Sequence, residues 1–149
     1  MSVESARHPD LPAILALEES FAEPRWSAQA WAEELASERG LVLVERDADG
    51  AVFGVAAFSH VGGVADLNRI VVRPDRRQRG VGRRLVLAGL EWASRIGARQ
   101  VMLEVGAGNE PARALYARLG FVALARRANY YGAGHDAIVM ALALQEDES

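Results

Sequence analysis

The chain has 149 residues, half of them hydrophobic, and a formal net charge of −3. This length fits one domain, which we place over residues 1–144, followed by a loose acidic tail at 145–149. The absence of cysteine excludes disulfides and thiolate metal sites, and the negative charge gives no support to direct nucleic-acid binding. The three histidines lack metal-ligand spacing, and no apolar run reaches the roughly 20 residues of a membrane helix. We therefore expect a cytoplasmic protein without a metal, and a monomer or weak dimer.

The hydrophobic pattern predicts eleven elements in chain order. They are strand 3–7, helix 10–19 capped by Asp10, helix 28–38 capped by Ser27 and ended by Gly40, strands 41–46, 51–60 and 64–72, helix 82–97, strand 100–105, helix 109–119, and strands 121–127 and 136–144. The order β-α-α-β-β-β-α-β-α-β-β predicts an α/β (α+β) fold. We expect a mixed, mostly antiparallel central sheet of about six to seven strands with helices on both faces.

A glycine-rich turn stands between the strand that ends at Val72 and the helix that follows. It reads Arg77-Gln78-Arg79-Gly80-Val81-Gly82-Arg83. Such a turn directs backbone N–H groups toward one point, where the helix dipole also favours an anion, and glycine allows close approach. Seven Arg and one Asp lie between residues 69 and 84. A charge run alone is more often a solvated loop, but around a phosphate cradle it attracts anions. The turn therefore predicts a phosphorylated cofactor.

Two common phosphate-binding motifs do not match this turn. A nucleotide-triphosphate loop needs G-x-x-x-x-G-K-[S/T], and the chain contains no lysine. A dinucleotide fold needs G-x-G-x-x-G after the first strand, whereas Leu85 stands here in place of the third glycine and the turn lies mid-chain. Both alternatives fail on particular residues.

The turn, together with a second motif, resembles the GNAT superfamily of acetyl-coenzyme A-dependent N-acetyltransferases. The first motif includes the preceding strand end, Ile70-Val71-Val72-Arg73-Pro74, and the second is Asn109-x-x-Ala112-x-x-Leu115-Tyr116-x-x-x-Gly120-Phe121. The resemblance implies a GNAT-like fold and acetyl-CoA as co-substrate. It further implies that the amides of residues 77–83 hold the pyrophosphate. The pantetheine arm would then run along Ile70, Val71 and Val72 and contact Asn109.

Glu104 is the candidate general base. It lies in the apolar strand Val101-Met102-Leu103-Glu104-Val105 and shares a face with Met102 and Gly106 in a period-two pattern. A semi-buried carboxylate there would have a raised pKa, suited to proton transfer near neutral pH. The alternative is an exposed residue paired with one of the many arginines. The resemblance favours the base, because N-terminal acetyltransferases of this superfamily place theirs at this Leu-Glu-Val position.

Tyr116 is the candidate general acid, since a phenol is protonated at neutral pH and can donate to a departing thiolate. The alternative is a core aromatic, because Ala112, Leu115 and Leu119 share its helical face. The resemblance implies the catalytic role, and a backbone N–H near Val71 or Val72 as oxyanion donor. We expect the carboxylate and the phenol beside the reacting carbon, on one face of the sheet.

The acceptor is predicted to be a protein N-terminus. An α-amine is far easier to deprotonate than a lysine side chain, and several segments resemble the RimI-type ribosomal-protein-alanine N-acetyltransferases. These segments are Asp10 to Ile14 with Glu18, Ser20-Phe21, Pro24 to Ser27 with Trp31 and Glu34-Leu35, Leu103 to Val105, Arg126 to Tyr131, and Asp136 to Met140. The resemblance implies a small-subunit ribosomal protein as partner and a substrate groove at Trp26, Tyr130, Tyr131 and Asp136.

The match departs from that group in one place, where Gly106 and Gly108 replace an arginine and a serine. Groove contacts near Gly106 and the identity of the acceptor are therefore open. A small-molecule amine or a lysine side chain is the alternative acceptor. A non-catalytic acyl-CoA-binding module is the alternative from another class of protein.

Overall fold

The computed structural model describes residues 3–20 and 25–144 of the chain. The predicted tail 145–149, and Phe21 and Pro24 of the quoted segments, lie outside the described residues. Within these residues the chain forms, in order, β1 (Glu4–Ser5), α1 (Leu11–Glu18), α2 (Ala28–Ala36), β2 (Gly40–Arg46), β3 (Val52–Val61), β4 (Val64–Val72), α3 (Val81–Arg95), β5 (Gln100–Gly106), α4 (Glu110–Arg118), β6 (Val122–Arg127) and β7 (Ala137–Ala143). Two short 3-10 helices, His8–Asp10 and Pro74–Arg76, precede α1 and α3.

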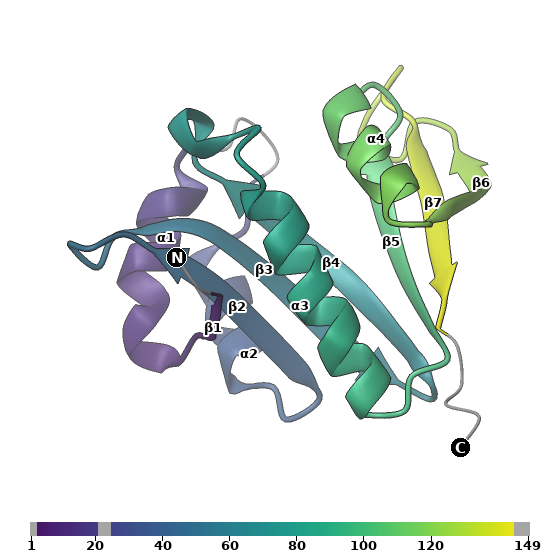
Figure 1. Ribbon diagram of the computed structural model, residues 1–149. Helices are drawn as coiled ribbons and strands as arrows, with labels where there is room; N and C mark the ends of the chain where they lie inside the picture. The colour runs from purple at the N-terminus through teal and green to yellow at the C-terminus, as the bar shows by residue number, and fades with distance from the viewer. Residues whose placement is uncertain (1–2, 21–24, 145–149) are drawn as a thin grey trace.

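The described strands form one seven-stranded sheet in the order β1-β2-β3-β4-β5-β7-β6 (Figure 1). Neighbouring strands are antiparallel except β4 and β5, which are parallel because α3 carries the chain back between them. The predicted fold class is confirmed, including the mostly antiparallel sheet and the order of its elements.

One predicted helix end and one predicted helix cap are wrong. Gly40 does not end α2, which stops at Ala36; it begins β2 opposite Ser59. A Cβ atom at Gly40 would lie 3.0 Å from the Phe58 carbonyl oxygen, so this glycine permits close strand approach. Asp10 precedes α1, but its side chain makes no cap hydrogen bond to the helix. Its oxygens accept from the Arg7 N–H and the Arg46 guanidinium instead.

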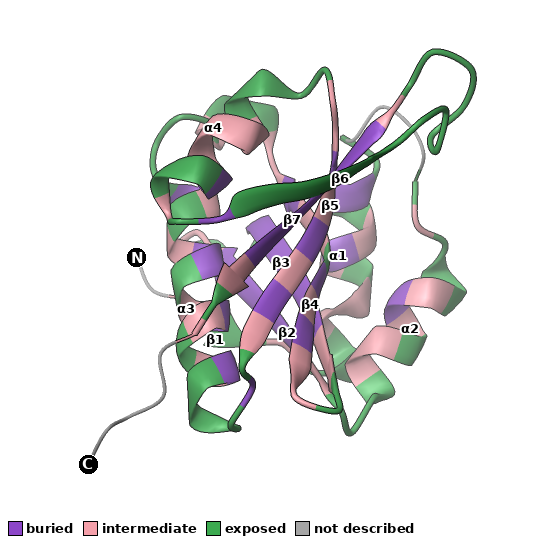
Figure 2. Cartoon of the chain, turned by 90° about the vertical axis from the view of Figure 1, so that its right-hand side faces the viewer, coloured by how far each residue is buried: buried purple, intermediate pink, exposed green. Residues whose placement is uncertain are grey.

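Two separate apolar clusters cover the two faces of the sheet. On one face α3 packs Leu85 and Val86 against sheet residues such as Phe58. On the other, α1 and α2 pack residues such as Ile14 and Trp31. Figure 2 shows α3 and α4 on one side of the sheet, and α1 and α2 on the other. The helices therefore lie on both faces, as predicted.

The sheet opens between β4 and β5. Their pairing runs only from Val64–Gln100 to Leu67–Leu103. At that point β4 contains a bulge, because Leu67 faces Phe58 and Arg69 faces Ala57, which leaves Asn68 as an extra residue. Beyond it the two strands separate toward α4 (Figure 1). The bulge and the short ladder thus create an opening in the middle of the sheet.

Candidate active site

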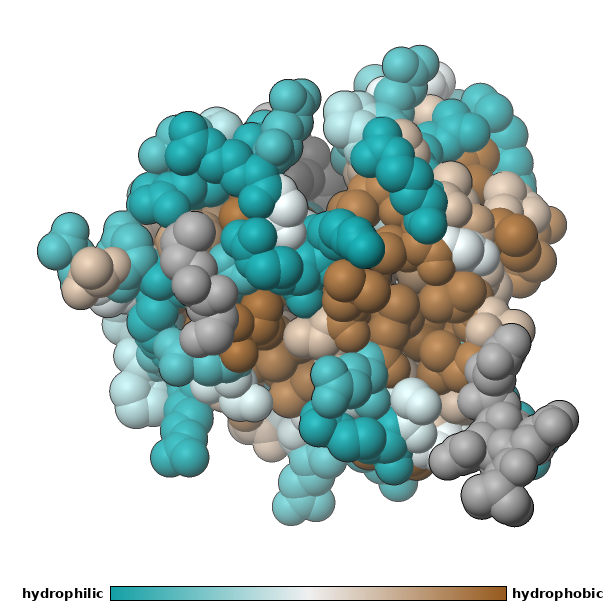
Figure 3. All heavy atoms as spheres, in the orientation of Figure 1, coloured by the Kyte–Doolittle hydropathy of each residue, from teal (hydrophilic) through white to brown (hydrophobic). Residues whose placement is uncertain are grey.

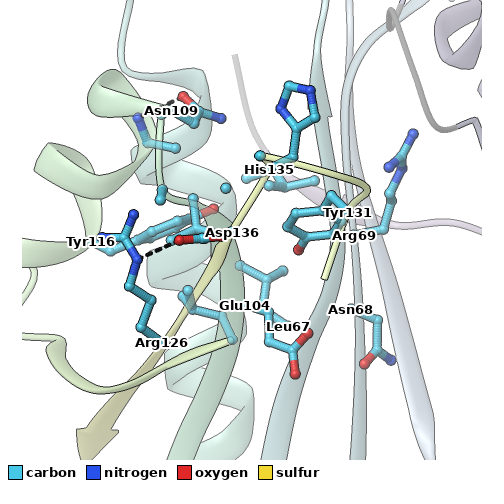
Figure 4. Close-up of a pocket in the computed structure, with 18 residues that line it drawn as sticks. Leu67, Asn68, Arg69, Glu104, Asn109, Tyr116, Arg126, Tyr131, His135 and Asp136 are labelled. Atoms are coloured by element: carbon cyan, nitrogen blue, oxygen red, sulfur yellow. Dashed lines mark hydrogen bonds and ion pairs between the residues drawn. The ribbon is translucent and has the colours of Figure 1, made fainter. Parts of the chain in front are cut away.

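A groove of about 1030 Å³, here called the first groove, occupies the opening between β4 and β5 (Figure 4). Its lining comes from β4, β5, α4 and the loop between β6 and β7, and it includes Ile70, Glu104, Asn109, Tyr116, Tyr131 and Asp136. All six are residues that the sequence singled out. They come from four separate segments, which the opening brings together.

A second groove of about 670 Å³ lies on the side of α2. Three of the four residues predicted for a substrate groove, Trp26, Tyr130 and Tyr131, line it together with Glu34 and Asp66. The fourth, Asp136, lines the first groove instead. The two grooves share residues of β4 and β5 at the opening, and both are lined by Glu104 and Tyr131. Glu104 is therefore accessible from two sides.

Glu104 is half-buried, as expected of a base in the apolar strand, and it is also paired with an arginine, as the alternative interpretation expected. Its carboxylate pairs with Arg127 at 3.1 Å, and 29% of its side-chain surface is exposed. The Arg127 side chain is 53% exposed and lies over the Tyr130 ring at 5.2 Å. The carboxylate therefore has a cationic neighbour that solvent also reaches, and it lines both grooves.

Tyr116 is buried, with 4% of its surface exposed, and packs edge-on against Phe121. Burial raises the pKa of the Tyr116 phenol above its ordinary value, and the nearby Tyr131 adds to this effect. The phenol is thus protonated throughout the neutral range, as a proton donor must be. The core-aromatic interpretation also holds in part, since Tyr116 belongs to the apolar cluster under α3.

The expectation that Glu104 and Tyr116 share one face of the sheet is wrong. Tyr116 clusters with Leu103 and Val105 on the α3 side, whereas Glu104 alternates with them and faces the groove beside α2. Both side chains nevertheless line the first groove, because the sheet is open there. A group seated in the opening is therefore accessible from both.

The glycine turn has the backbone shape expected of an anion cradle. Gly80 at the start of α3 has a left-handed φ of 81°, and Gln78 has a positive φ of 62°. The Arg84 N–H is the first to bond back along the helix, to the Gly80 carbonyl at 2.9 Å. The N–H groups just before it lie in the first turn, which has no helical acceptors. Anions favour such a place.

Arginine side chains hold this turn in shape. Arg77 donates to the Val72 carbonyl at 3.1 Å, and Arg84 donates to the Arg79 carbonyl at 3.2 Å. Arg84 also pairs with the fully buried Glu45 at 2.6 Å. Figure 3 shows hydrophilic side chains gathered over this region, at the upper left of the view. The turn is thus a preformed, basic element at the N-terminus of α3.

Residues 77–83 do not themselves line the first groove. They adjoin it through Gly82, where an added Cβ would lie 4.0 Å from Ile70 and 3.3 Å from Leu115. Of the predicted pantetheine strand, Ile70 lines the groove, whereas Val71 is buried in the opposite cluster and offers only its backbone. Donors for an anion therefore adjoin a groove lined by both apolar and polar residues, which fits a molecule with a diphosphate and a long neutral arm.

Asn109 and Asp136 have structural contacts in addition to lining the first groove. Asn109 caps α4, since its side-chain oxygen accepts from the Ala112 N–H at 3.3 Å. Asp136 accepts from the Asn129 N–H at 2.8 Å and from Arg126 at 2.7 Å. Both hydrogen bonds lower the pKa of Asp136, and the one from the Asn129 N–H has the larger effect. Asp136 therefore fixes the loop that carries Tyr130 and Tyr131.

A buried cluster around Glu18 was not predicted. Glu18 is 3% exposed; it accepts from the Trp31 indole at 2.9 Å and from two nitrogens of Arg69. Arg69 lines both grooves and lies 5.8 Å from the Trp26 ring, which packs on Trp31. The signal available in the sequence was the position of Glu18, an acidic residue that directly follows Leu17 in a helix whose apolar positions include Ile14. Its partner, 51 residues away, could not be read from spacing.

Two other kinds of feature are absent from the described residues. No group of three or more His, Cys, Asp or Glu residues there could hold a metal ion. None of the helices in the same part of the chain has the length and apolar character needed to cross a membrane.

The fold and the site define an acetyltransferase of one family. Residues 8–121 match the model of the Acetyltransferase (GNAT) family, so the chain belongs to that family. This confirms the family predicted from the two motifs, and with it the predicted class of enzyme.

One relative matches the chain over nearly its whole length. The chain is 33% identical over 144 residues to the [ribosomal protein bS18]-alanine N-acetyltransferase of Escherichia coli K12, covering 95% of this chain and 96% of that one. The crystal structure of the ribosomal-protein-S18-alanine N-acetyltransferase from Escherichia coli superimposes with a TM-score of 0.89 at 31% identity, covering 99% and 97% of the two chains.

A second kind of relative matches over a shorter stretch. Mycothiol acetyltransferase of Clavibacter michiganensis is 43% identical over 81 residues, which are 54% of this chain and 26% of that enzyme. The chain spans about a quarter to a third of the length of three such relatives, namely two mycothiol acetyltransferases and an uncharacterized protein of Mycobacterium leprae.

Proposed function

We propose that the chain is an acetyl-CoA-dependent N-acetyltransferase that acts on the N-terminal α-amine of a protein, with alanine as the first residue and a small-subunit ribosomal protein as the partner. The observation that carries this proposal is the meeting of two grooves at Glu104, one beside the glycine turn and one with aromatic walls. The full-length similarity to the Escherichia coli bS18-alanine enzyme supports the choice of acceptor.

Binding of acetyl-CoA would use the turn and the first groove. The amides of residues 77–83 would hold the diphosphate, aided by the exposed Arg79 and Arg83. Ile70, the backbone of Val71 and Val72, and Asn109 would contact the neutral arm. The thioester, once bound, supplies the acetyl group.

The residues at the opening would then manage two protons and a developing charge. Arg127 would first leave the Glu104 carboxylate. Glu104 then takes a proton from the incoming ammonium group, either directly or through a water. The neutral nitrogen forms the new C–N bond, loses its second proton to solvent, and the C–S bond breaks. Tyr116 gives its proton to the departing sulfur and regains one from solvent, and Glu104 returns its proton to solvent, so one proton is released overall. A backbone N–H of β4 beyond the bulge would stabilise the oxyanion.

A panel of peptides with varied first residues tests this proposal. We expect acetylation of alanine-starting peptides, measured by release of free thiol, and little acetylation of the same peptides with a blocked α-amine. Acetylation of an internal lysine in the blocked peptide would move the assignment to lysine side chains. Cofactor binding without turnover for every amine would support the non-catalytic alternative.

A small-molecule amine is the second candidate acceptor. The match to mycothiol acetyltransferase supports it, because that match is the higher in identity although it covers only 26% of that enzyme. Small amines and aminoglycosides assayed beside the peptides separate the two candidates. A higher kcat/KM for a small amine than for every peptide would favour this second function.

A further inference from the structure

Asp66 is a groove residue that no motif points to. It lies on β4 opposite Met102 of β5 in the parallel ladder. Met102 and Glu104 point to the same face of β5, because side chains alternate along a strand. Asp66 and Glu104 both line the second groove, and their charges are close enough to interact. Two carboxylates from neighbouring strands therefore face one space.

The charges around Asp66 leave the groove acidic. Glu34 enters from α2, Arg69 from β4 and Arg127 from β6, with the phenols of Tyr130 and Tyr131 on the loop. Both arginines already have a carboxylate partner other than Asp66 and Glu34, since Arg69 pairs with Glu18 and Arg127 with Glu104. Among the described residues Asp66 forms no salt bridge, and Glu34 has only the Asn68 amide at 3.5 Å. Two carboxylates therefore lack a cationic partner inside this groove.

One cation already lies at this place in the structure. The guanidinium of Arg127 contacts Glu104 and lies over the face of the Tyr130 ring. Carboxylates and aromatic faces together form a favourable environment for a positive charge. Because Arg127 is half exposed, an incoming cation can take its position without breaking a buried contact.

We propose that Asp66 is a specificity-determining residue of the second groove, and that it holds the acceptor as a protonated amine beside Glu104. This inference rests on the proposed function. The ammonium group displaces Arg127, Asp66 accepts a hydrogen bond from it, and Glu104 takes the proton that must leave. The groove therefore selects amines that are cationic at neutral pH, such as an α-amine, and disfavours neutral or acidic ends.

The test compares Asp66→Asn with the wild-type chain, using an alanine-starting peptide and its des-amino form. Binding is measured by calorimetry with coenzyme A present, so that no acetyl group is transferred. The wild-type chain should bind the amine at least about tenfold more tightly than the des-amino peptide, because one charge-assisted hydrogen bond is lost without it. Asp66→Asn should remove most of this difference. It should also raise the KM for the peptide about tenfold and leave the acetyl-CoA affinity unchanged.

Asp49→Asn is the matched control, because Asp49 is exposed in the turn between β2 and β3. It should leave every value at the wild-type level. Equal discrimination in Asp66→Asn and wild type would overturn the inference, while turnover of the peptide would keep the proposed function. If no peptide is acetylated, the proposed function fails, and the KM for spermidine in the same variants decides the role of Asp66 alone. An unchanged KM for spermidine in Asp66→Asn, or the absence of spermidine turnover, would also overturn the inference.

Discussion

Glu104 and Tyr116 reach the opening from opposite faces of β5, and this separates their two roles. Glu104 lies beside the solvent-accessible second groove, from which an acceptor can enter. Tyr116 is buried on the α3 side, where only a group inside the opening can contact it. A proton can thus enter on one side of the reacting carbon and leave on the other.

These positions predict the effects of two isosteric substitutions. Glu104→Gln and Tyr116→Phe should each lower kcat by about 100-fold or more, since each removes one proton-transfer group, while acetyl-CoA still binds. Because burial raises the pKa of Tyr116, the phenol stays protonated, and the loss in Tyr116→Phe should be equal at about pH 6 and about pH 9. Steady-state kinetics and calorimetry measure both effects. Glu91→Gln, on the exposed side of α3, serves as control, and normal turnover in either variant would refute the assigned role.

Asp66 and Glu34, two carboxylates of the second groove, should destabilise the folded state at neutral pH. Burial raises the pKa of Asp66, with the Glu104 charge as a second cause, and burial raises the pKa of Glu34. The folded state therefore binds more protons than the unfolded chain, so these two groups make stability fall as pH rises from about 4 through their raised pKa values. Asp66→Asn should raise Tm by about 1 to 3 °C at neutral pH, a small value because the group is only partly buried.

At about pH 3 the same substitution should leave Tm unchanged, because both forms of the side chain are then neutral. Thermal unfolding followed by circular dichroism at the two pH values measures the difference. A lower Tm at neutral pH would contradict the account, since it would show that the carboxylate stabilises the fold. A stabilised variant that binds its acceptor poorly is the pattern expected of a functional charge.

Among the elements, the glycine turn before α3 invites a comparison with another turn. Gly80 and Gly50 both have left-handed backbones, with φ of 81° and 85°. Substitution by alanine at either position should therefore cost about 1 kcal/mol of folding free energy. Only Gly80 belongs to the proposed cradle, where an added Cβ would also lie 3.2 Å from the Arg84 side chain.

Gly80→Ala should therefore weaken acetyl-CoA binding by about tenfold or more, through loss of charge-assisted amide contacts. Gly50→Ala should lower Tm by a similar amount and leave the affinity unchanged. Calorimetric titration with acetyl-CoA gives both affinities. Equal affinities in the two variants would show that the turn does not hold the cofactor.

The contact between α1 and β4 depends on Glu18. Glu18→Ala would leave the Arg69 guanidinium and the Trp31 indole without their buried acceptor. Breaking a buried ion pair in this way should cost about 3 to 5 kcal/mol. Glu91→Ala, which removes an exposed pair with Arg95, should change stability by less than about 0.5 kcal/mol. Denaturant unfolding measures both variants.

Removing both partners tests the cause of this loss. Glu18→Ala combined with Arg69→Leu should be more stable than Glu18→Ala alone, because the guanidinium that has lost the Glu18 carboxylate is then absent. A double variant that is less stable than the single one would show that Arg69 stabilises the fold by packing and not by its charge pair.

At the scale of the whole molecule, local sequence patterns predicted the helices and strands better than the contacts between them. Periodicity and turn residues predicted the sheet and its helices, two motifs singled out the glycine turn and Tyr116, and the resemblance at Leu103 to Val105 singled out Glu104. The Asn68 bulge has no local signal, because it depends on how β3 and β4 pair. The faces of Glu104 and Tyr116 depend on the same opening, and the Glu18–Arg69 pair joins residues far apart in sequence. These features follow from pairing between distant segments, which residue spacing does not encode.

The opening divides the described sheet into two parts that share little pairing. Strands β1 to β4 and strands β5 to β7 are connected by one parallel ladder of four residue pairs. A ligand that lies between them and contacts both parts should therefore stabilise the whole fold. At a concentration of about 100 times its Kd, acetyl-CoA should add about 2.7 kcal/mol and raise Tm by about 5 to 10 °C. S-acetylpantetheine at the same concentration should raise Tm much less, because it lacks the diphosphate that the turn would hold.

Thermal shift measurements and hydrogen exchange at β4 and β5 check this prediction together. Protection should rise beyond Leu67 and Leu103, where the ladder ends, and also at residues 77–83. In Gly80→Ala the Tm rise should shrink at a fixed acetyl-CoA concentration, since the affinity is lower, and in Gly50→Ala it should not. An equal Tm rise with S-acetylpantetheine and acetyl-CoA would contradict the role of the turn. Protection confined to the outer strands would contradict a ligand in the opening.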